Sequence, residues 1–347
     1  MSDQTIVSLA ALVALAGLMA YAVFGGADFG GGVWSLFATG PRKELQRRAV
    51  AEAMGPVWEV NHVWLIFVIV VLFTCFPRGF GALVTGLFVP LHLVLVGIIL
   101  RGAAFVFRGY GPSPAASENA RASGHYARWG TIFGIASVIS PLLLGAAFGA
   151  LTAGEIRVDP AGRVRSASPV PWLHVYPISC GLLALSTCAY LAAVFLVVET
   201  TGQLQEDFRR RAIFAGTATA SLALFTLVAA RMEAKWFFDQ LTAPMVWPVI
   251  AAGMIAFAGS AVAVFARWNY AARWFAGAQT VLMLLGWGMA HRQYLIYPDI
   301  PLAAAAGPRE TIVFLLISLV PGATLLIPAL WLLFRTFKSP SARTMHS

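Results

Sequence analysis

Long apolar runs, repeated along the whole chain, constrain what this sequence can fold into more than any other feature. A helix needs about 20 predominantly apolar residues to cross the hydrocarbon core of a bilayer. Runs of roughly this length recur about nine times, which predicts about nine membrane-spanning helices. The predicted spans cover residues 5–24, 57–76, 80–100, 129–150, 173–198, 212–230, 245–266, 274–290 and 311–334.

The composition agrees with this interpretation and excludes a soluble enzyme. Hydrophobic residues make up 59% of the chain and charged residues 11%, whereas a soluble domain carries about 25% charged residues. The segments between the predicted spans are too short to hold a folded domain outside the membrane. The sequence therefore predicts an all-α polytopic membrane protein in which residues 1–347 form a single integral-membrane domain.

The distribution of Lys and Arg predicts the orientation of the chain. If the N-terminus lies outside, the inner loops and the C-terminal tail carry roughly twice as many basic residues as the outer loops. This bias favours an N-outside, C-inside topology. The net charge of +9 then reflects membrane topology and contact with anionic lipid, and no nucleic-acid partner is expected.

A short polar segment at the start of the second predicted span is the strongest functional signal. Residues 55–64 place Glu59, Asn61 and His62 directly before the apolar run 65–76. Ionisable groups at the edge of hydrocarbon cost several kcal/mol unless they are paired, hydrated or used, so they are candidates for function.

Three further ionisable residues fall on the same predicted side of the membrane: Asp28, Glu52 and Arg101. Two interpretations remain open. In the first, these groups form a charge network that anchors helix ends, with Arg101 as the charge partner of Glu59. In the second, the carboxylates take up protons from the cytoplasm and pass them inward through the amide and imidazole of the polar segment, since pumps and proton-consuming enzymes use such relays.

Histidines and cysteines are the candidate ligands of a metal or haem in this sequence. His62 and His92 fall on adjacent predicted spans within about one helical turn in depth, and opposed histidines can ligate a haem iron. A lone histidine in a membrane helix is more commonly a hydrogen-bonded core residue, and that interpretation is favoured. The three cysteines form no CxxC motif, so neither a zinc site nor a disulfide is expected.

A glycine-rich segment at residues 25–32 superficially suggests a phosphate-binding loop. It lacks the Lys-Ser/Thr pair that such a loop requires, and no strand is predicted before it. Glycines in membrane helices permit close approach of two backbones. The segment therefore predicts tight helix packing.

Three segments in the first third of the chain carry a family resemblance. Residues 21–30, 55–65 and 100–108 resemble, in order and spacing, motifs of subunit II of the cytochrome bd-type quinol oxidases. The motif residues in the second segment are Gly55, Pro56, Trp58 and Trp64. Beyond these segments the similarity lies in the pattern of spans.

The resemblance implies a specific biochemistry. Such oxidases are complexes of the bacterial cytoplasmic (inner) membrane that oxidise quinol and reduce dioxygen to water, in some cases with a small accessory peptide. Subunit I carries two b-type haems and a third haem of d or b type. Subunit II is implied to form two four-helix bundles plus one peripheral helix, without haem ligands. In some members it contributes to cytoplasmic proton uptake or holds a structural quinone.

The sequence departs from the family pattern at several positions. Gly25 and Val106 stand where the family has acids, Glu59 replaces an aspartate, and Glu52 stands where asparagine is common. These departures suggest that Glu59, aided by Glu52, carries the uptake of protons. Whether Asp28 conducts protons or fixes a helix end is left open. Two other hypotheses remain: a purely structural or assembly subunit of the oxidase, and a secondary transporter, which would usually show internal repeats and a polar midplane site.

Overall fold

Helices make up nearly all of this fold, as expected for a chain whose backbone groups cannot bond to water within the bilayer. A computed structural model describes the backbone of residues 2–110, 120–166 and 170–338. Within these ranges, the side chains of residues 54–60, 108–110, 120–127, 166, 327, 330–331 and 333–338 lie outside the description.

Eight of the nine predicted spans each correspond to one long helix in the described ranges, and the span 80–100 covers one long helix and the end of the shorter helix before it. The long helices are α1 (Asp3–Leu36), α2 (Lys43–Cys75), α4 (Phe88–Tyr110), α5 (Ala120–Ala153), α6 (Val175–Glu199), α7 (Gly202–Glu233), α9 (Trp247–Phe265), α10 (Asn269–His291) and α12 (Arg309–Lys338). Among the described residues, 7 helices are individually long and apolar enough to cross a membrane. Counting the bent pair of helices at residues 61–75 and 77–86 as one span gives a number of up to 8.

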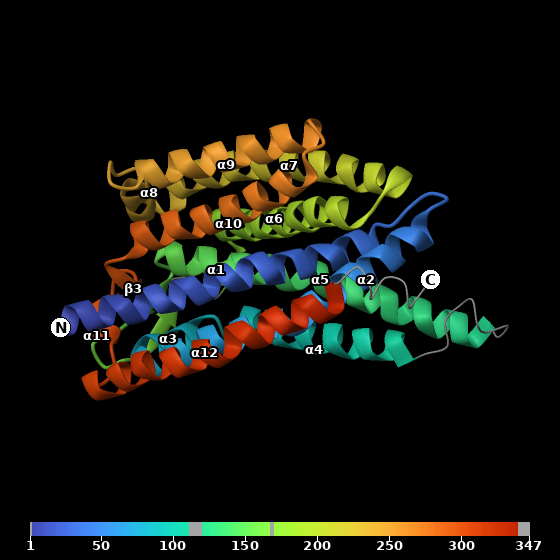
Figure 1. Ribbon diagram of the computed structural model, residues 1–347. Helices are drawn as coiled ribbons and strands as arrows, with labels where there is room; N and C mark the ends of the chain where they lie inside the picture. The colour runs from blue at the N-terminus through green and yellow to red at the C-terminus, as the bar shows by residue number, and fades with distance from the viewer. Residues whose placement is uncertain (1, 111–119, 167–169, 339–347) are drawn as a thin grey trace.

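Short elements occupy the connections between the long helices. They are α3 (Pro77–Gly86), α8 (Lys235–Leu241), α11 (Leu302–Ala305) and the 3-10 helix η1 (Pro171–Leu173). Strand β1 (Ile156–Val158) pairs antiparallel with β2 (Val164–Ser166), and β3 (Tyr294–Ile296) pairs antiparallel with β4 (Ile300–Pro301). Figure 1 shows β3 and α11 at the end of the molecule where the N-terminus lies.

The long helices form two bundles that share a central seam. Helices α1, α2, α4 and α5 make the first bundle, and α6, α7, α9 and α10 make the second. Helix α6 packs against both α1 and α5 and so joins the bundles, while α12 lies at the periphery against α2 and α1 (Figure 1). The predicted all-α architecture of two four-helix bundles plus a peripheral helix is confirmed.

Close approach between α1 and α6 at this seam depends on glycine. A Cβ atom added at Gly30 would collide with the backbone carbonyl of Cys188 and lie 2.7 Å from the Cβ atom of Ala192. Both partners belong to α6, whose small side chains are buried in the larger core cluster. The glycine-rich segment therefore provides the tight packing that its composition predicts.

Helix α2 ends in a sharp bend, where α3 begins at Pro77. The two helices are inclined by 119°. A bend frees backbone carbonyls that the helix would otherwise satisfy, and Cys75 O accepts a hydrogen bond of 2.8 Å from Gly307 N. Cys75 and Phe76 are almost completely buried, so the irregular backbone is enclosed by protein.

An ion pair joins the two hairpins at the N-terminal end. Asp299, in the β3–β4 turn, accepts hydrogen bonds from Arg157 Nε at 2.8 Å and Arg157 Nη2 at 3.0 Å. It also accepts one from Val158 N at 2.8 Å. The hydrogen bonds from Arg157 lower the pKa of Asp299 below its usual value of 3.8, against the opposing effect of partial burial.

We expect Asp299→Asn to lower the free energy of unfolding by about 1 kcal/mol at neutral pH. Because the pKa of Asp299 is depressed in the folded protein, its contribution is fully present above pH 3.8 and is lost as the pH falls below that value. The difference in thermal midpoint between the purified wild type and the Asp299→Asn variant should therefore stay the same from pH 8 to pH 5. A difference that shrinks within that range would contradict the prediction. Asp239→Asn, which removes an exposed pair with Lys235, should have little effect.

Candidate functional site

A buried ion pair lies at the centre of the first bundle. Arg101 on α4 donates from Nη2 to Asp28 Oδ1 on α1 at 2.6 Å, and to the Asp28 backbone carbonyl at 3.1 Å. Each side chain is 2% exposed. Among the salt bridges between described residues, no other has both side chains buried to this degree. Since burying two charges is costly unless further groups satisfy them, the surroundings of this pair decide whether it is stable.

The pair is held by groups from all four helices of the bundle. Asn61 on α2 donates from Nδ2 to Asp28 Oδ2 at 3.2 Å. The guanidinium carbon of Arg101 lies 4.4 Å from the ring centroid of Phe29 on α1 and 4.8 Å from that of Phe133 on α5. Aromatic faces attract a desolvated cation, so the charge of Arg101 is balanced by one carboxylate and two rings.

A small cavity of about 10 Å³ adjoins the ion pair. Its polar lining comes from Tyr21, Asn61, His62 and Arg101. A space of this size accommodates about one water molecule. The site therefore combines a paired charge, an amide, an imidazole and a phenol around a space in which a proton carrier fits.

The structure brings some predicted site residues together and places others elsewhere. Asp28, Asn61, His62 and Arg101 meet in one cluster. Glu52 is exposed and pairs with Arg48 at 2.7 Å along its own helix. Asp28 lies inside α1, about two turns before its end at Leu36, rather than at the end of the span.

Helix α2 runs through the family-motif positions Gly55, Pro56, Trp58 and Glu59. Their side chains lie outside the described residues, so the expected contact between Glu59 and Arg101 stays a prediction. Trp64 is half-buried, and its ring centroid lies 6.0 Å from that of Phe67.

His62 and His92 differ in their surroundings. His62 lines the cavity, whereas His92 is exposed, with its ring 3.8 Å from that of Phe88 and its Nδ1 2.7 Å from the Phe88 carbonyl. Among the described residues, no group of three or more His, Cys, Asp or Glu side chains is arranged to hold a metal ion.

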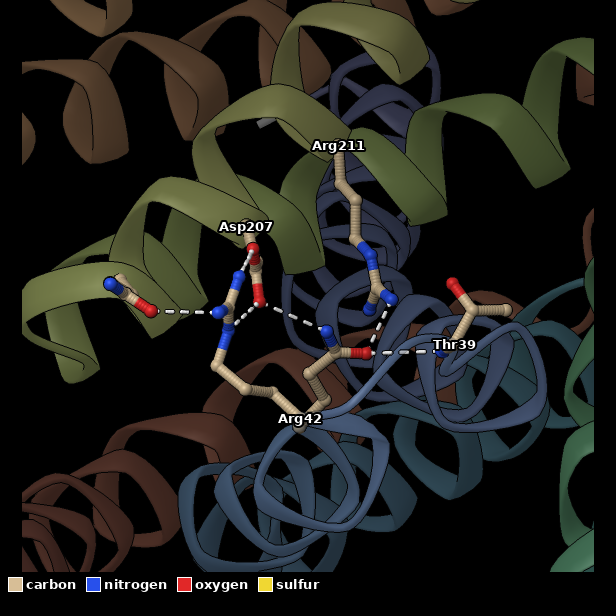
Figure 2. A network of polar contacts seen from close by, with 6 residues as sticks. Thr39, Arg42, Asp207 and Arg211 are labelled. Atoms are coloured by element: carbon tan, nitrogen blue, oxygen red, sulfur yellow. Dashed lines mark hydrogen bonds and ion pairs between the residues drawn. The ribbon is translucent and has the colours of Figure 1, made fainter.

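Sequence reasoning missed a second polar cluster, which joins the two bundles and which we call the Arg42–Asp207 clamp. Figure 2 shows Arg42, just before α2, pointing toward Asp207 on α7. Arg42 donates from Nε to Asp207 Oδ2 at 2.8 Å and from Nη2 to Asp207 Oδ1 at 2.7 Å. Gln46 donates to Asp207 at 3.0 Å and accepts from Arg211 at 2.6 Å. No local pattern links positions 165 residues apart; the only signal is an acid beside three arginines at 209–211.

The middle of the second bundle is bridged by neutral groups. Tyr190 Oη on α6 and Ser260 Oγ on α9 lie 2.6 Å apart, and Ser260 donates to the Ala272 carbonyl on α10 at 3.1 Å. Among the salt bridges between described residues, the one in which both side chains are only 2% exposed lies in the first bundle. This contrast assigns the candidate site to the first bundle.

Comparisons with known proteins agree with one another. The profile of a family described as cytochrome bd terminal oxidase subunit II matches residues 6–337. A cytochrome bd ubiquinol oxidase subunit 2 of Bacillus subtilis (strain 168) is 28% identical over 233 residues, which is 67% of this chain and 65% of the relative. A putative cytochrome bd menaquinol oxidase subunit II of the same organism is 24% identical over 330 residues, 91% of each chain.

Two further comparisons extend this picture. Cytochrome bd-I ubiquinol oxidase subunit 2 of Escherichia coli (strain K12) is 29% identical over 212 residues, which cover 60% of this chain and 52% of the relative. The match therefore spans about half the length of that protein. The structure of bd oxidase from Geobacillus thermodenitrificans contains a chain with a TM-score of 0.80 and 21% identity. The match covers 96% of this chain and 98% of the Geobacillus chain, so the two chains share a fold.

Proposed function

Because the chain belongs to the family of cytochrome bd terminal oxidase subunit II, we propose that it is the second subunit of a membrane quinol oxidase that reduces dioxygen to water. The family profile matches nearly the whole chain, and the relatives carry the names of ubiquinol and menaquinol oxidase subunits. The shared fold with a bd oxidase chain supports the same assignment.

In this proposal the redox centres belong to the partner, a haem-bearing subunit I that carries two b-type haems and a third haem of d or b type. The exposed position of His92, with its ring tilted against that of Phe88, does not fit an internal haem ligand. Subunit II supplies packing surface in the bacterial cytoplasmic membrane, with its N-terminus outside. Contacts of α1 with helices of both bundles support treating residues 1–347 as one integral-membrane domain.

We further propose that the first bundle contributes to proton uptake from the cytoplasm. Oxygen reduction consumes protons in a site shielded from water, so a polar route must reach it through the bundle. The observation that carries the proposal is the buried cluster of Asp28, Asn61 and Arg101 beside a cavity lined by His62. Glu59 precedes this cluster on α2, and exposed Glu52 is placed to collect protons from the aqueous phase.

A purely structural role is the second candidate, and one specific observation favours it. Asp28 and Arg101 are tightly paired and enclosed by aromatic rings, as expected of groups that fix helix positions. The two candidates predict different phenotypes. Loss of a structural group prevents assembly, whereas loss of a proton-transfer group leaves an assembled oxidase with normal haem content and slow turnover.

Glu59→Gln tests the proton-uptake role. We expect oxygen consumption per haem to fall at least about tenfold, because the amide cannot carry a proton, while haem content stays normal. Asp207→Asn is the control, since it weakens the Arg42–Asp207 clamp without touching the cavity. It should lower the thermal midpoint and leave turnover per haem unchanged. Wild-type turnover and proton uptake in the Glu59 variant would remove that residue from the path.

A further inference from the structure

Three buried polar atoms around the cavity have no hydrogen-bond partner within the described residues. They are Tyr21 Oη, Asn61 Oδ1 and Arg101 Nε. The three residues are 8%, 3% and 2% exposed. Buried polar atoms in native proteins are satisfied by protein or by ordered water in the great majority of cases, so three such atoms in one place require an explanation.

The three residues line the same cavity, whose volume of about 10 Å³ matches one water molecule. The chemistry of the three atoms is also complementary to water. Asn61 Oδ1 accepts a hydrogen bond, Arg101 Nε donates one, and a phenol hydroxyl does either. A single water can therefore donate to the amide, accept from the guanidinium and bond to the phenol, which makes the three bonds typical of a buried water.

The local packing directs these groups toward one another. Tyr21, Gly25 and Asp28 lie at helical spacing on α1, so they share one face. A Cβ atom added at Gly25 would lie 2.6 Å from Asn61 Oδ1 and 3.2 Å from Tyr21 Cε2. The amide oxygen and the tyrosine ring thus converge over the glycine, and the absent side chain leaves them room.

We propose that this cavity binds one ordered water molecule, held by Tyr21, Asn61 and Arg101, and that this water connects the ion pair with His62. The water site stands on the geometry alone, whereas its part in proton transfer rests on the proposed function. An asparagine amide and an arginine guanidinium hold their protons at physiological pH. Water and a phenol hydroxyl accept one proton while releasing another. Protons that pass this cluster therefore move through the water and Tyr21 instead of through the charged pair.

The test uses the complete oxidase with its partner subunit. Electron cryomicroscopy at a resolution that shows ordered waters should reveal one density peak within hydrogen-bond distance of Tyr21 Oη, Asn61 Oδ1 and Arg101 Nε. Tyr21→Phe, which removes one hydroxyl and keeps the ring, should remove or weaken that peak. Tyr190→Phe is the matched control, because its hydroxyl bonds to Ser260 in the second bundle and is not among those that line this cavity. A wild-type map without density at this position would overturn the inference, and this result does not depend on any variant folding.

Turnover separates the water site from the proposed function. We expect Tyr21→Phe to lower oxygen consumption per haem several-fold with unchanged haem spectra, and Tyr190→Phe to leave it unchanged. Density present in the wild type and lost in Tyr21→Phe supports the binding site. If the Tyr21 variant then turns over at the wild-type rate, proton transfer through this water is overturned. A slow Glu59→Gln oxidase would still support proton uptake by another route.

Discussion

Replacing Arg101 with methionine is expected to prevent accumulation of the assembled oxidase. The change leaves the Asp28 carboxylate, 2% exposed, without a cation in an apolar bundle. Breaking a buried pair by removing one partner costs about 3–5 kcal/mol, a large part of the 5–15 kcal/mol by which typical proteins are stable. The measurement is the amount of haem-containing complex per milligram of membrane protein. Normal accumulation would show that the pair does not stabilise the bundle.

A double-mutant cycle then distinguishes the structural role from the proton role. Asp28→Leu combined with Arg101→Met removes both charges, and replacing a buried pair with apolar groups is often neutral for stability. We expect the double variant to recover much of the assembly that either single variant loses. Recovered assembly with slow turnover supports proton transfer at this cluster. Recovery of both assembly and turnover would assign the pair to structure alone.

Gly30→Ala is expected to have the second large effect. The added methyl group would collide with the Cys188 carbonyl and approach the Ala192 side chain, so α1 and α6 must separate. Overpacking in a core typically costs 1–3 kcal/mol, and a backbone atom yields less readily than a side chain. The thermal midpoint and the yield of the complex should both fall.

The matched control is Gly277→Ala in α10, where an added Cβ meets no atom within 4 Å. This variant should be neutral or stabilised by up to about 1 kcal/mol, because alanine favours helix more than glycine does. Equal effects of the two substitutions would show that close approach at the seam is not what requires Gly30.

Hydrophobic runs predicted the number and order of the long helices, because the thickness of the bilayer sets the length of a span. They did not predict where the helices end. Helix α2 begins at Lys43, well before the predicted start at residue 57. A helix can extend past the hydrocarbon core into water through charged residues, and apolar runs do not detect that part. The predicted span 80–100 is divided into α3 and α4 at Leu87.

The sequence predicted a similar depth in the membrane for Asp28, Asn61, His62 and Arg101. It did not predict which of these residues pair with one another. Depth follows from position along a helix, whereas pairing depends on how each helix is rotated about its axis and packed. For this reason the partner of Asp28, 73 residues away, was not identified. Tyr21 belonged to a recognised motif, yet its place in the cavity wall depends on the same packing.

The hydrogen bond from Gly307 to the Cys75 carbonyl has a consequence for biogenesis. Translation delivers α2 and α3 to the membrane long before residue 307 leaves the ribosome. Until then the bend between these helices lacks the donor that satisfies its carbonyl, and such a group is costly in lipid. We expect the early helices to wait in an open arrangement, which insertion of α12 and its preceding loop then locks. A nascent chain that ends before residue 307 should therefore remain a substrate for membrane quality-control proteases.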